Sequence, residues 1–341
     1  MRNYELVVFK VDLTLKLETR AQIAILVIVL SSAVVAGYFV STGRYSSNEK
    51  VYPHAHHAPI SIADSSDFTS SDSSTGCSCV VAGSGTAGDP YVIAGWEIDA
   101  SEKDAISVWS VSEHFRITQV TVSGTQQRLG IRLEEVRNAE VSNSTIVRAF
   151  AAISVFKSNE IVIFDNVVGN CKLGVTLEAS DSNRIARNTL NDIKQVAIFV
   201  RGSDNLVEDN SIGESYGAIN VDGTAGRADR NVVRNNSLTR AEAYGIGLWT
   251  ARRNTVSGNT VIEGGDVGIL VVESSMDNLI EHNDVSRNKG NGILVVASSN
   301  NLVQNNVAIG NGDGINTFDL YSDGSSNVWK DNTFGTREPD T

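Results

Sequence analysis

The stretch "NLIEHNDVSRNKGNGILVVASSNNLVQNNVAIGNGDGI", residues 278–315, contains two versions of one phrase. NLIEHNDV begins at Asn278 and returns as NLVQNNVA at Asn301, an interval of 23 residues, and a Gly-Ile pair follows each version. A period between about 20 and 50 residues indicates a solenoid, in which one short structural unit stacks on the next.

The Asn phrase, Asn-x-apolar-x-x-Asn-x-apolar, extends in both directions from this stretch. It has seven clean copies, whose two Asn residues are Asn183 and Asn188, Asn205 and Asn210, Asn231 and Asn236, Asn254 and Asn259, Asn278 and Asn283, Asn301 and Asn306, and Asn327 and Asn332. The apolar pair continues further, in ten copies at intervals of 22 to 26 residues: Ile117/Val122, Val141/Ile146, Ile163/Val168, Ile185/Leu190, Val207/Ile212, Val233/Leu238, Val256/Val261, Ile280/Val285, Val303/Ala308 and Trp329/Phe334.

A second phrase, Gly/Ala-Ile/Val-x-apolar, lies between the Asn phrases. Its ten copies begin at Ala105, Gly130, Ala152, Gly174, Ala197, Ala218, Gly245, Gly268, Gly292 and Gly314. Both phrases alternate with a period of two, so each predicts a short strand with one buried face. The sequence therefore predicts an all-β parallel solenoid of about ten coils.

The repeated Asn residues predict ladders at the corners of this solenoid. An Asn amide can bond the coil above and the coil below, and Asn tolerates the unusual backbone angles of turns. The repeat length is then one circumference of the solenoid.

These repeats resemble the right-handed parallel β-helix repeat family of the pectate-lyase-like superfamily, including carbohydrate-binding and sugar-hydrolase repeats and NosD-like proteins. The segment "GDPYVIAGWEIDAS", residues 88–101, is similar to the segment that precedes the first coil in those proteins. The resemblance covers roughly residues 80–335 and implies a fold rather than an activity, because the matching residues are those that make coils.

The region before the repeats predicts export. Residues 21–43 carry no charge and are long enough to form a transmembrane helix. Arg2, Lys10, Lys16 and Arg20 precede it, so residues 1–20 are expected in the cytoplasm and the remainder outside. The alternative is a cleaved signal peptide and secretion.

Composition divides the rest of the chain. Residues 44–78, rich in His, Ser and Asp, predict a disordered linker, residues 79–335 the β-helix, and residues 336–341 a tail. The net charge is −12, and residues 51–341 hold 22 Lys/Arg against 36 Asp/Glu, which argues against a nucleic-acid partner. The three cysteines, Cys77, Cys79 and Cys171, are expected to be free small side chains.

The expected linker contains His54, His56 and His57 in "YPHAHHAP". Clustered imidazoles can bind copper or zinc, although a linker supplies no neighbouring groups to orient them. We therefore predict no cofactor, with a metal site at these three histidines as the alternative. By analogy with NosD, that alternative implies copper handling.

The second phrase predicts a column of outward side chains, one per coil at about 4.8 Å spacing. The column reads Trp109, Glu134, Phe156, Glu178, Arg201, Asp222, Trp249, Val272, Val296 and Phe318. Aromatic rings alternating with charged groups are suited to a sugar polymer, so the seven residues from Trp109 to Trp249 are the predicted glycan-binding site. The structural alternative is a surface charge ladder of Glu178, Arg201 and Asp222.

A catalytic alternative uses the same three residues. Glu178 and Asp222 lie two coils apart, roughly 9 to 10 Å, near the upper end of the carboxylate separation in inverting glycosidases, with Arg201 between them. Pectate lyases, which belong to the superfamily that these repeats resemble, use an Arg-x-Pro-x-x-Arg motif. No proline occurs between Pro90 and Pro339, so the coils lack this motif. The site is therefore expected to be non-catalytic.

Four apolar residues interrupt the polar outward pattern: Leu270, Val272, Leu294 and Val296. A patch of this kind predicts contact with a protein partner or a second copy. Taken together, the sequence predicts a membrane-tethered extracytoplasmic β-helix that binds glycans or cell-envelope components. The alternatives are a polysaccharide hydrolase or lyase, a copper-handling protein, and a structural surface protein with a protein partner.

Overall fold

The computed structural model describes residues 50–69, 78–313, 315–324 and 326–337, and Val51–Thr341 belong to one compact unit. The predicted cytoplasmic segment and membrane helix, residues 1–43, lie outside the described residues. Among the described residues, none forms a helix of the length and apolarity that crossing a membrane requires.

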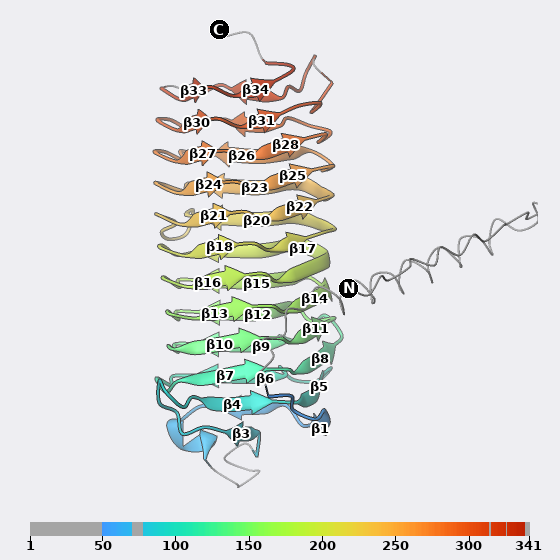
Figure 1. The fold of residues 1–341 in the computed structure, drawn as a ribbon, viewed down its shortest axis with the longest axis vertical. Helices are drawn as coiled ribbons and strands as arrows, with labels where there is room; N and C mark the ends of the chain where they lie inside the picture. The colour runs from blue at the N-terminus through green and yellow to red at the C-terminus, as the bar shows by residue number, and fades with distance from the viewer. Residues whose placement is uncertain (1–49, 70–77, 314, 325, 338–341) are drawn as a thin grey trace, which may run out of the picture. The chain divides into compact units, whose positions relative to one another are not determined.

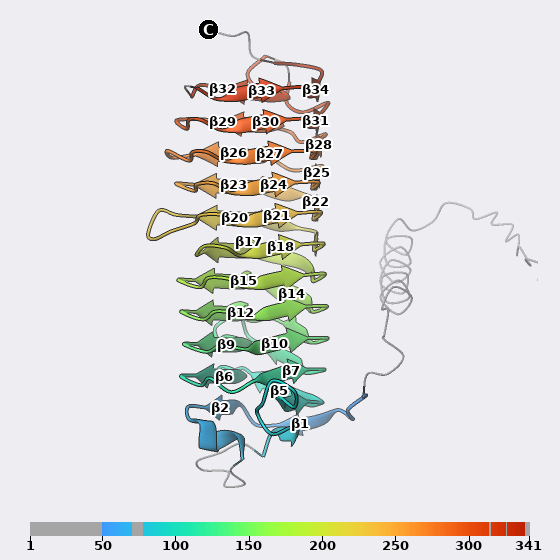
Figure 2. The ribbon, with the colours of Figure 1, turned by 60° about the vertical axis from the view of Figure 1, so that its left-hand side comes forward.

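The compact unit is a right-handed parallel β-solenoid of about ten coils, whose strands stack in three columns (Figures 1 and 2). Face A is a 12-stranded sheet made of β3 (Val80–Ala82), β4 (Tyr91–Ala94), β7 (Phe115–Thr118), β10 (Ala139–Ser142), β13 (Val162–Phe164), β16 (Arg184–Ala186), β18 (Leu206–Glu208), β21 (Val232–Arg234), β24 (Thr255–Ser257), β27 (Leu279–Glu281), β30 (Leu302–Gln304) and β33 (Val328–Lys330). Every pairing between named strands is parallel except that of β3 with β4.

The other two faces share one 22-stranded sheet, because β17 (Thr189–Arg201) runs through both. Face B contains β1 (Ala55–His57), β5 (Trp96–Ala100), β8 (Thr121–Gly124), β11 (Thr145–Val147), β14 (Val167–Cys171), the start of β17, β19 (Ser211–Ile212), β22 (Ser237–Thr239), β25 (Thr260–Ile262), β28 (Asp284–Ser286), β31 (Val307–Ala308) and β34 (Thr333–Phe334). Face C contains β2 (Ile60–Ile62), β6 (Ile106–Trp109), β9 (Ile131–Glu134), β12 (Ala151–Phe156), β15 (Leu173–Glu178), the end of β17, β20 (Ser215–Asp222), β23 (Ala241–Trp249), β26 (Val267–Val272), β29 (Ile293–Val295) and β32 (Leu320–Ser322).

The apolar pairs of the Asn phrase form the core, as the sequence predicts. Nine of the ten pairs, from Ile117/Val122 to Val303/Ala308, are at most 2 % exposed. They stack in register, for example Ile163 on Ile185 and Ile185 on Val207. The tenth pair, Trp329 and Phe334, lies on the last described coil, where Phe334 is 42 % exposed.

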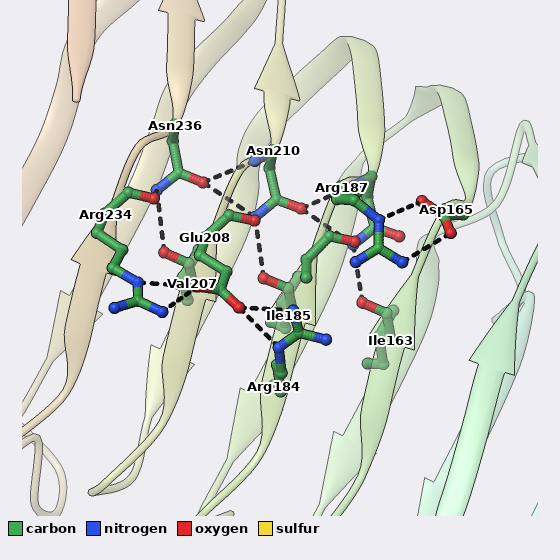
Figure 3. Close-up of polar contacts among 12 residues, drawn as sticks. Ile163, Asp165, Arg184, Ile185, Arg187, Val207, Glu208, Asn210, Arg234 and Asn236 are labelled. Atoms are coloured by element: carbon green, nitrogen blue, oxygen red, sulfur yellow. Dashed lines mark hydrogen bonds and ion pairs between the residues drawn. The ribbon is translucent and has the colours of Figure 1, made fainter. Parts of the chain in front are cut away.

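Asn ladders hold the coils together, which confirms the prediction from the Asn phrase. The Asn188 backbone N–H and its Nδ2 both donate to Asn210 Oδ1, at 2.9 and 3.0 Å. Asn210 Nδ2 in turn donates to Asn236 Oδ1 and, at 3.0 Å, to the backbone oxygen of Ile185 (Figure 3). One ladder runs from Asn183 to Asn327 and the other from Asn166 to Asn332.

The residue before each ladder Asn turns the chain so that the amide points inward. Arg187, Asp209 and Asn235 have φ values of 53°, 56° and 55°, in the left-handed region that L-residues seldom adopt. The two buried hydrogen bonds accepted by the following Asn offset this backbone cost, because each satisfies a donor that would otherwise be buried without a partner.

We predict that Asn236→Ala lowers the free energy of unfolding by about 3 kcal/mol, because it leaves the N–H and Nδ2 of Asn210 without their buried acceptor. The control is Asn305→Gly at an exposed turn position with φ of 54°, which should change stability by less than about 0.5 kcal/mol. Chemical denaturation measures both. Equal effects would contradict a ladder that stabilises the coils.

The tenth copy of the second phrase, at Gly314, was predicted wrongly. Ile315, the apolar residue of that copy, is 77 % exposed, and the strand that pairs with β29 is β32, with Leu320 opposite Ile293. The Asp313 carboxylate accepts the N–H groups of Ile315, Asn316 and Thr317, which draws this segment into a turn. Phe318 therefore does not belong to the outward column, and Asp323 follows β32 at that place.

The coiled region also begins earlier than the sequence indicates. The segment 88–101, expected before the first coil, contains β4 and β5, which pair in register with β7 and β8. The linker prediction for residues 44–78 is wrong for residues 51–69, because β1 pairs with β5 and β2 with β6. The remainder of that expected linker, residues 44–49 and 70–77, lies outside the described residues.

A short 3₁₀ helix, η1 (Ser65–Phe68), covers the N-terminal end of the core. Phe68 is 2 % exposed, and its ring centroid lies 4.7 Å from Tyr91 and 5.6 Å from Phe115. The composition of residues 44–78 does not reveal this role, because the segment is mostly polar and only a few apolar residues, Phe68 among them, close the end of the core.

The cysteines differ in state. Cys79 is disulfide-bonded, against the expectation of a free thiol, whereas Cys171 is free and buried.

We predict that Phe68→Ala lowers the free energy of unfolding by about 3 kcal/mol or more, as expected for a buried ring. If the segment were a linker, the substitution would have no effect. The matched control is Phe150→Ala, at a position 39 % exposed, where the loss should stay below about 1 kcal/mol. Thermal and chemical unfolding of the full-length protein measure both variants.

Ion pairs link the coils on the outer surface of face A. Glu208, whose side chain is 6 % exposed, accepts from Arg184 below and Arg234 above, at 2.6 to 2.8 Å (Figure 3). Burial opposes its ionisation, but the hydrogen bonds from Arg234 and Arg184 outweigh burial and hold the pKa of Glu208 below its ordinary value.

Glu208→Gln should therefore destabilise the protein at pH 7 and not in acid. A lowered pKa in the folded state contributes stability above the ordinary pKa of 4.5, and this contribution disappears as the pH falls through the lowered value. The difference in melting temperature between wild type and variant should close on acidification. Glu160→Gln, at an exposed position, is the control and should show no such pH dependence; a difference for Glu208 that stays constant down to acid pH would contradict the prediction.

Candidate functional site

The seven predicted site residues lie side by side on the outer surface of face C. Strand register places Trp109 opposite Glu134, Glu134 opposite Phe156 and Phe156 opposite Glu178. Glu178 is opposite Arg201, and Asp222 is opposite Trp249. The arrangement puts the group on consecutive coils from β6 to β23, with the aromatic rings separated by charged residues.

Arg201 forms the centre of the charged part. Its guanidinium lies 2.9 Å from Asp222 and 4.0 Å from Glu178, and it stands over the Phe199 ring at 5.0 Å. The loop after β20, which projects from the solenoid in Figure 2, adds Thr224, whose N–H donates to Asp222 at 2.7 Å. Glu178, Arg201 and Asp222 thus form a chain of ion pairs across three coils.

This pairing determines the protonation of Asp222. Burial raises its pKa, but the hydrogen bonds from Thr224 and Arg201 outweigh burial, so the pKa of Asp222 lies below its ordinary value. A general acid in glycoside hydrolysis needs a raised pKa. Asp222 is therefore an ionised partner of Arg201 and is poorly suited to donate a proton.

The basic groups further along the column are also paired. Arg132 forms an ion pair with Glu134 on the same strand. Lys157 lies 3.1 Å from Glu135 and 5.1 Å from the Phe156 ring centroid. Cations on this surface are thus held by the carboxylates beside them.

Trp249 and Tyr244 form an aromatic pair that the sequence predicted only in part. Their ring centroids lie 4.7 Å apart with planes at 65°. A Cβ added to Gly247 would come within 1.7 Å of the Trp249 ring, and one added to Gly217 within 2.3 Å of the Tyr244 ring. The two glycines therefore make room for the rings to lie on the sheet.

Tyr244, Phe199 and Asn220 were not predicted to belong to the site. Tyr244 is 8 % exposed, and burial raises its pKa to about 12. Asn220 Nδ2 donates to the Tyr244 hydroxyl at 3.4 Å. Gly247 is the residue in the sequence that could have indicated this aromatic pair. It occupies an outward position at which the two neighbouring strands carry larger residues, Asn220 and Leu270.

The predicted apolar patch continues from this aromatic pair. Val272 lies opposite Trp249, Leu270 opposite Leu294, and Tyr321 opposite Leu294 on the next coil. Leu270, Val272, Leu294 and Val296 are all half-buried on the outer surface. A role in partner contact stays a prediction.

The three histidines of the metal alternative do not converge. His56 Nδ1 lies 3.4 Å from Glu97, whereas the His57 ring packs against Trp96 at 4.7 Å. Successive residues of a strand point to opposite sides, so His56 and His57 cannot share one ion without rearrangement. No group of three or more metal-ligating side chains occurs among residues 50–69, 78–313, 315–324 and 326–337. As they lie here, the histidines do not form a copper site. Metal binding by them would require a rearrangement and stays a prediction.

Two family profiles match the chain. "Right handed beta helix region" matches residues 173–334, and "Periplasmic copper-binding protein (NosD)" matches residues 70–226. The NosD match therefore includes none of His54, His56 and His57. The chain belongs to the right-handed β-helix repeat proteins.

Similar solved structures share this fold at low sequence identity. The Azotobacter vinelandii mannuronan C-5 epimerase AlgE6 A-module has a TM-score of 0.55 and 13 % identity, over 92 % of this chain and 95 % of that one. An exopolygalacturonase from Thermotoga maritima has a TM-score of 0.50 and 9 % identity, over 71 % and 82 %. The catalytic domain of a GH87 α-1,3-glucanase in complex with nigerose has 0.51 and 13 %, over 69 % and 57 %. No curated protein sequence matches the chain.

Proposed function

We propose that this protein binds glycans or another cell-envelope component through the outer surface of face C, outside the cytoplasm and without catalysis. The observation that carries the proposal is the column of Trp109, Phe156 and Trp249 in register with Glu134, Glu178 and Asp222. Aromatic rings offer flat apolar surface, and carboxylates accept hydrogen bonds from hydroxyl groups.

The state of the charged residues favours binding over catalysis. Asp222 is held ionised by Thr224 and Arg201 and already accepts their hydrogen bonds, so it is poorly suited to act as the general acid of a glycosidase. The similar structures include an epimerase, an exopolygalacturonase and a glucanase, so a polysaccharide-modifying enzyme that uses Glu178, Asp222 and Arg201 is the second candidate.

Three observations support a location outside the cytoplasm. One matching family is described as periplasmic, Cys79 is disulfide-bonded, and residues 21–43 carry no charge. Disulfides persist in oxidising compartments. We propose residues 21–43 as a membrane tether, with cleavage and secretion as the alternative.

The first experiment is sedimentation of the full-length protein with insoluble polysaccharides, followed by size analysis of the polymer. We expect retention without shortening, and about tenfold weaker retention for Trp109→Ala and Trp249→Ala. Phe164→Ala, a half-buried aromatic residue on face A, is the control and should bind like wild type.

If wild type shortens the polymer and Glu178→Gln does not, the protein is instead the polysaccharide-modifying enzyme of the second candidate. The absence of retention on any polysaccharide would contradict glycan binding and direct attention to a protein partner at Leu270, Val272, Leu294 and Val296. Copper bound by the full-length protein and lost when the three histidines are replaced would favour the NosD-like candidate.

A further inference from the structure

We infer that the face formed by Trp249, Tyr244, Gly247 and Asn220, here called the Trp249 platform, is a subsite for an uncharged sugar and excludes uronates. The inference rests on the proposed glycan-binding function and specifies its ligand class. It depends on three features of the platform: the position of the indole against Gly247, the unpaired polar atoms near it, and the negative charge of the adjacent Asp222.

The indole of Trp249 can lie against the strand because Gly247 has no side chain. The position of Gly247 faces outward between Asn220 and Leu270 of the adjacent coils, and a Cβ there would overlap the ring. The edge of the platform is set by Tyr244, packed at 65° to the indole. The ring is half-buried, so part of it stays exposed and can contact the apolar face of a sugar.

Two polar atoms near the platform lack partners. Asn220 Oδ1 and Arg201 Nε are buried and make no hydrogen bond. Asn220 lies opposite Gly247, and Phe199, beneath the Arg201 guanidinium, lies opposite Asn220. Both atoms are covered, so ligand binding would have to uncover them. A sugar hydroxyl, which both donates and accepts, could then satisfy either atom, whereas an ionised carboxylate could accept from Arg201 but could not donate to Asn220.

The neighbouring charges oppose a uronate. Asp222 lies directly opposite Trp249 and is held ionised, and Glu178 stands three coils from Trp249. Arg201 is the cation between them and is already paired with both. A carboxylate placed over the platform would approach the negative Asp222, while the nearby cation, Arg201, is already paired, which makes its binding unfavourable.

The platform can be disrupted while its tryptophan is retained. Gly247→Ala inserts a Cβ into the space that the indole edge occupies and must displace the ring, yet the fold accepts side chains at this position on neighbouring coils, such as Asn220 and Leu270. The matched control is Gly169→Ala on β14 of face B, where the nearest atom to an added Cβ lies 3.7 Å away.

The test measures binding of the full-length protein to soluble neutral β-glucan, polygalacturonate and alginate. We expect the neutral glucan to bind at least tenfold more tightly than either polyuronate, with a Kd that changes little with salt. Gly247→Ala and Trp249→Ala should each raise the Kd for glucan about tenfold, and Gly169→Ala should leave it unchanged.

Polyuronate binding as tight as glucan binding would overturn this inference while leaving the proposed function intact. Wild-type affinity for glucan in Gly247→Ala, with a circular dichroism spectrum and melting temperature like those of wild type, would also overturn it. Failure to bind any of these polymers would overturn the inference together with the glycan-binding proposal.

Discussion

The buried hydrogen bond between stacked asparagine side chains is the interaction on which the rest of this structure depends. Each ladder Asn accepts from the coil before it and donates to the coil after it, as Asn210 does between Asn188 and Asn236. The amides are nearly inaccessible to water, so an unpaired one would be costly. The ladders therefore keep each coil at the same corner positions even where the intervals between coils vary from 22 to 26 residues.

This constraint leaves the outer surface free to vary. Insertions such as the loop after β20 occur between ladder positions and project outward without shifting the strands on either side (Figure 2). Because the register is preserved, an outward residue on one coil is aligned with its equivalent on the next. Charged residues then pair across coils, as Glu208 does with Arg184 and Arg234, and aromatic residues line up along face C.

The ends of the solenoid need different solutions, because they have no coil on one side. At the N-terminal end, Phe68 packs on Tyr91 and Phe115 and covers the core. Near the C-terminal end, a third ladder of Asn288 and Asn311 finishes on Asp319, whose carboxylate also accepts the N–H of Thr336. A carboxylate such as that of Asp319 can end a ladder because it accepts several hydrogen bonds and has no N–H group that would need an acceptor on a further coil.

The sequence by itself determined the parallel solenoid, its core pairs, two Asn ladders and the alignment of the column from Trp109 to Trp249, because all of these repeat with the coil. Tertiary structure alone decided the features that occur once. Asp313 folds Ile315 out of the coil, residues 51–69 close the N-terminal end, and the indole of Trp249 packs against Gly247. Such features depend on contacts between neighbouring coils and caps, and a periodic pattern carries no information about a contact that is made only once.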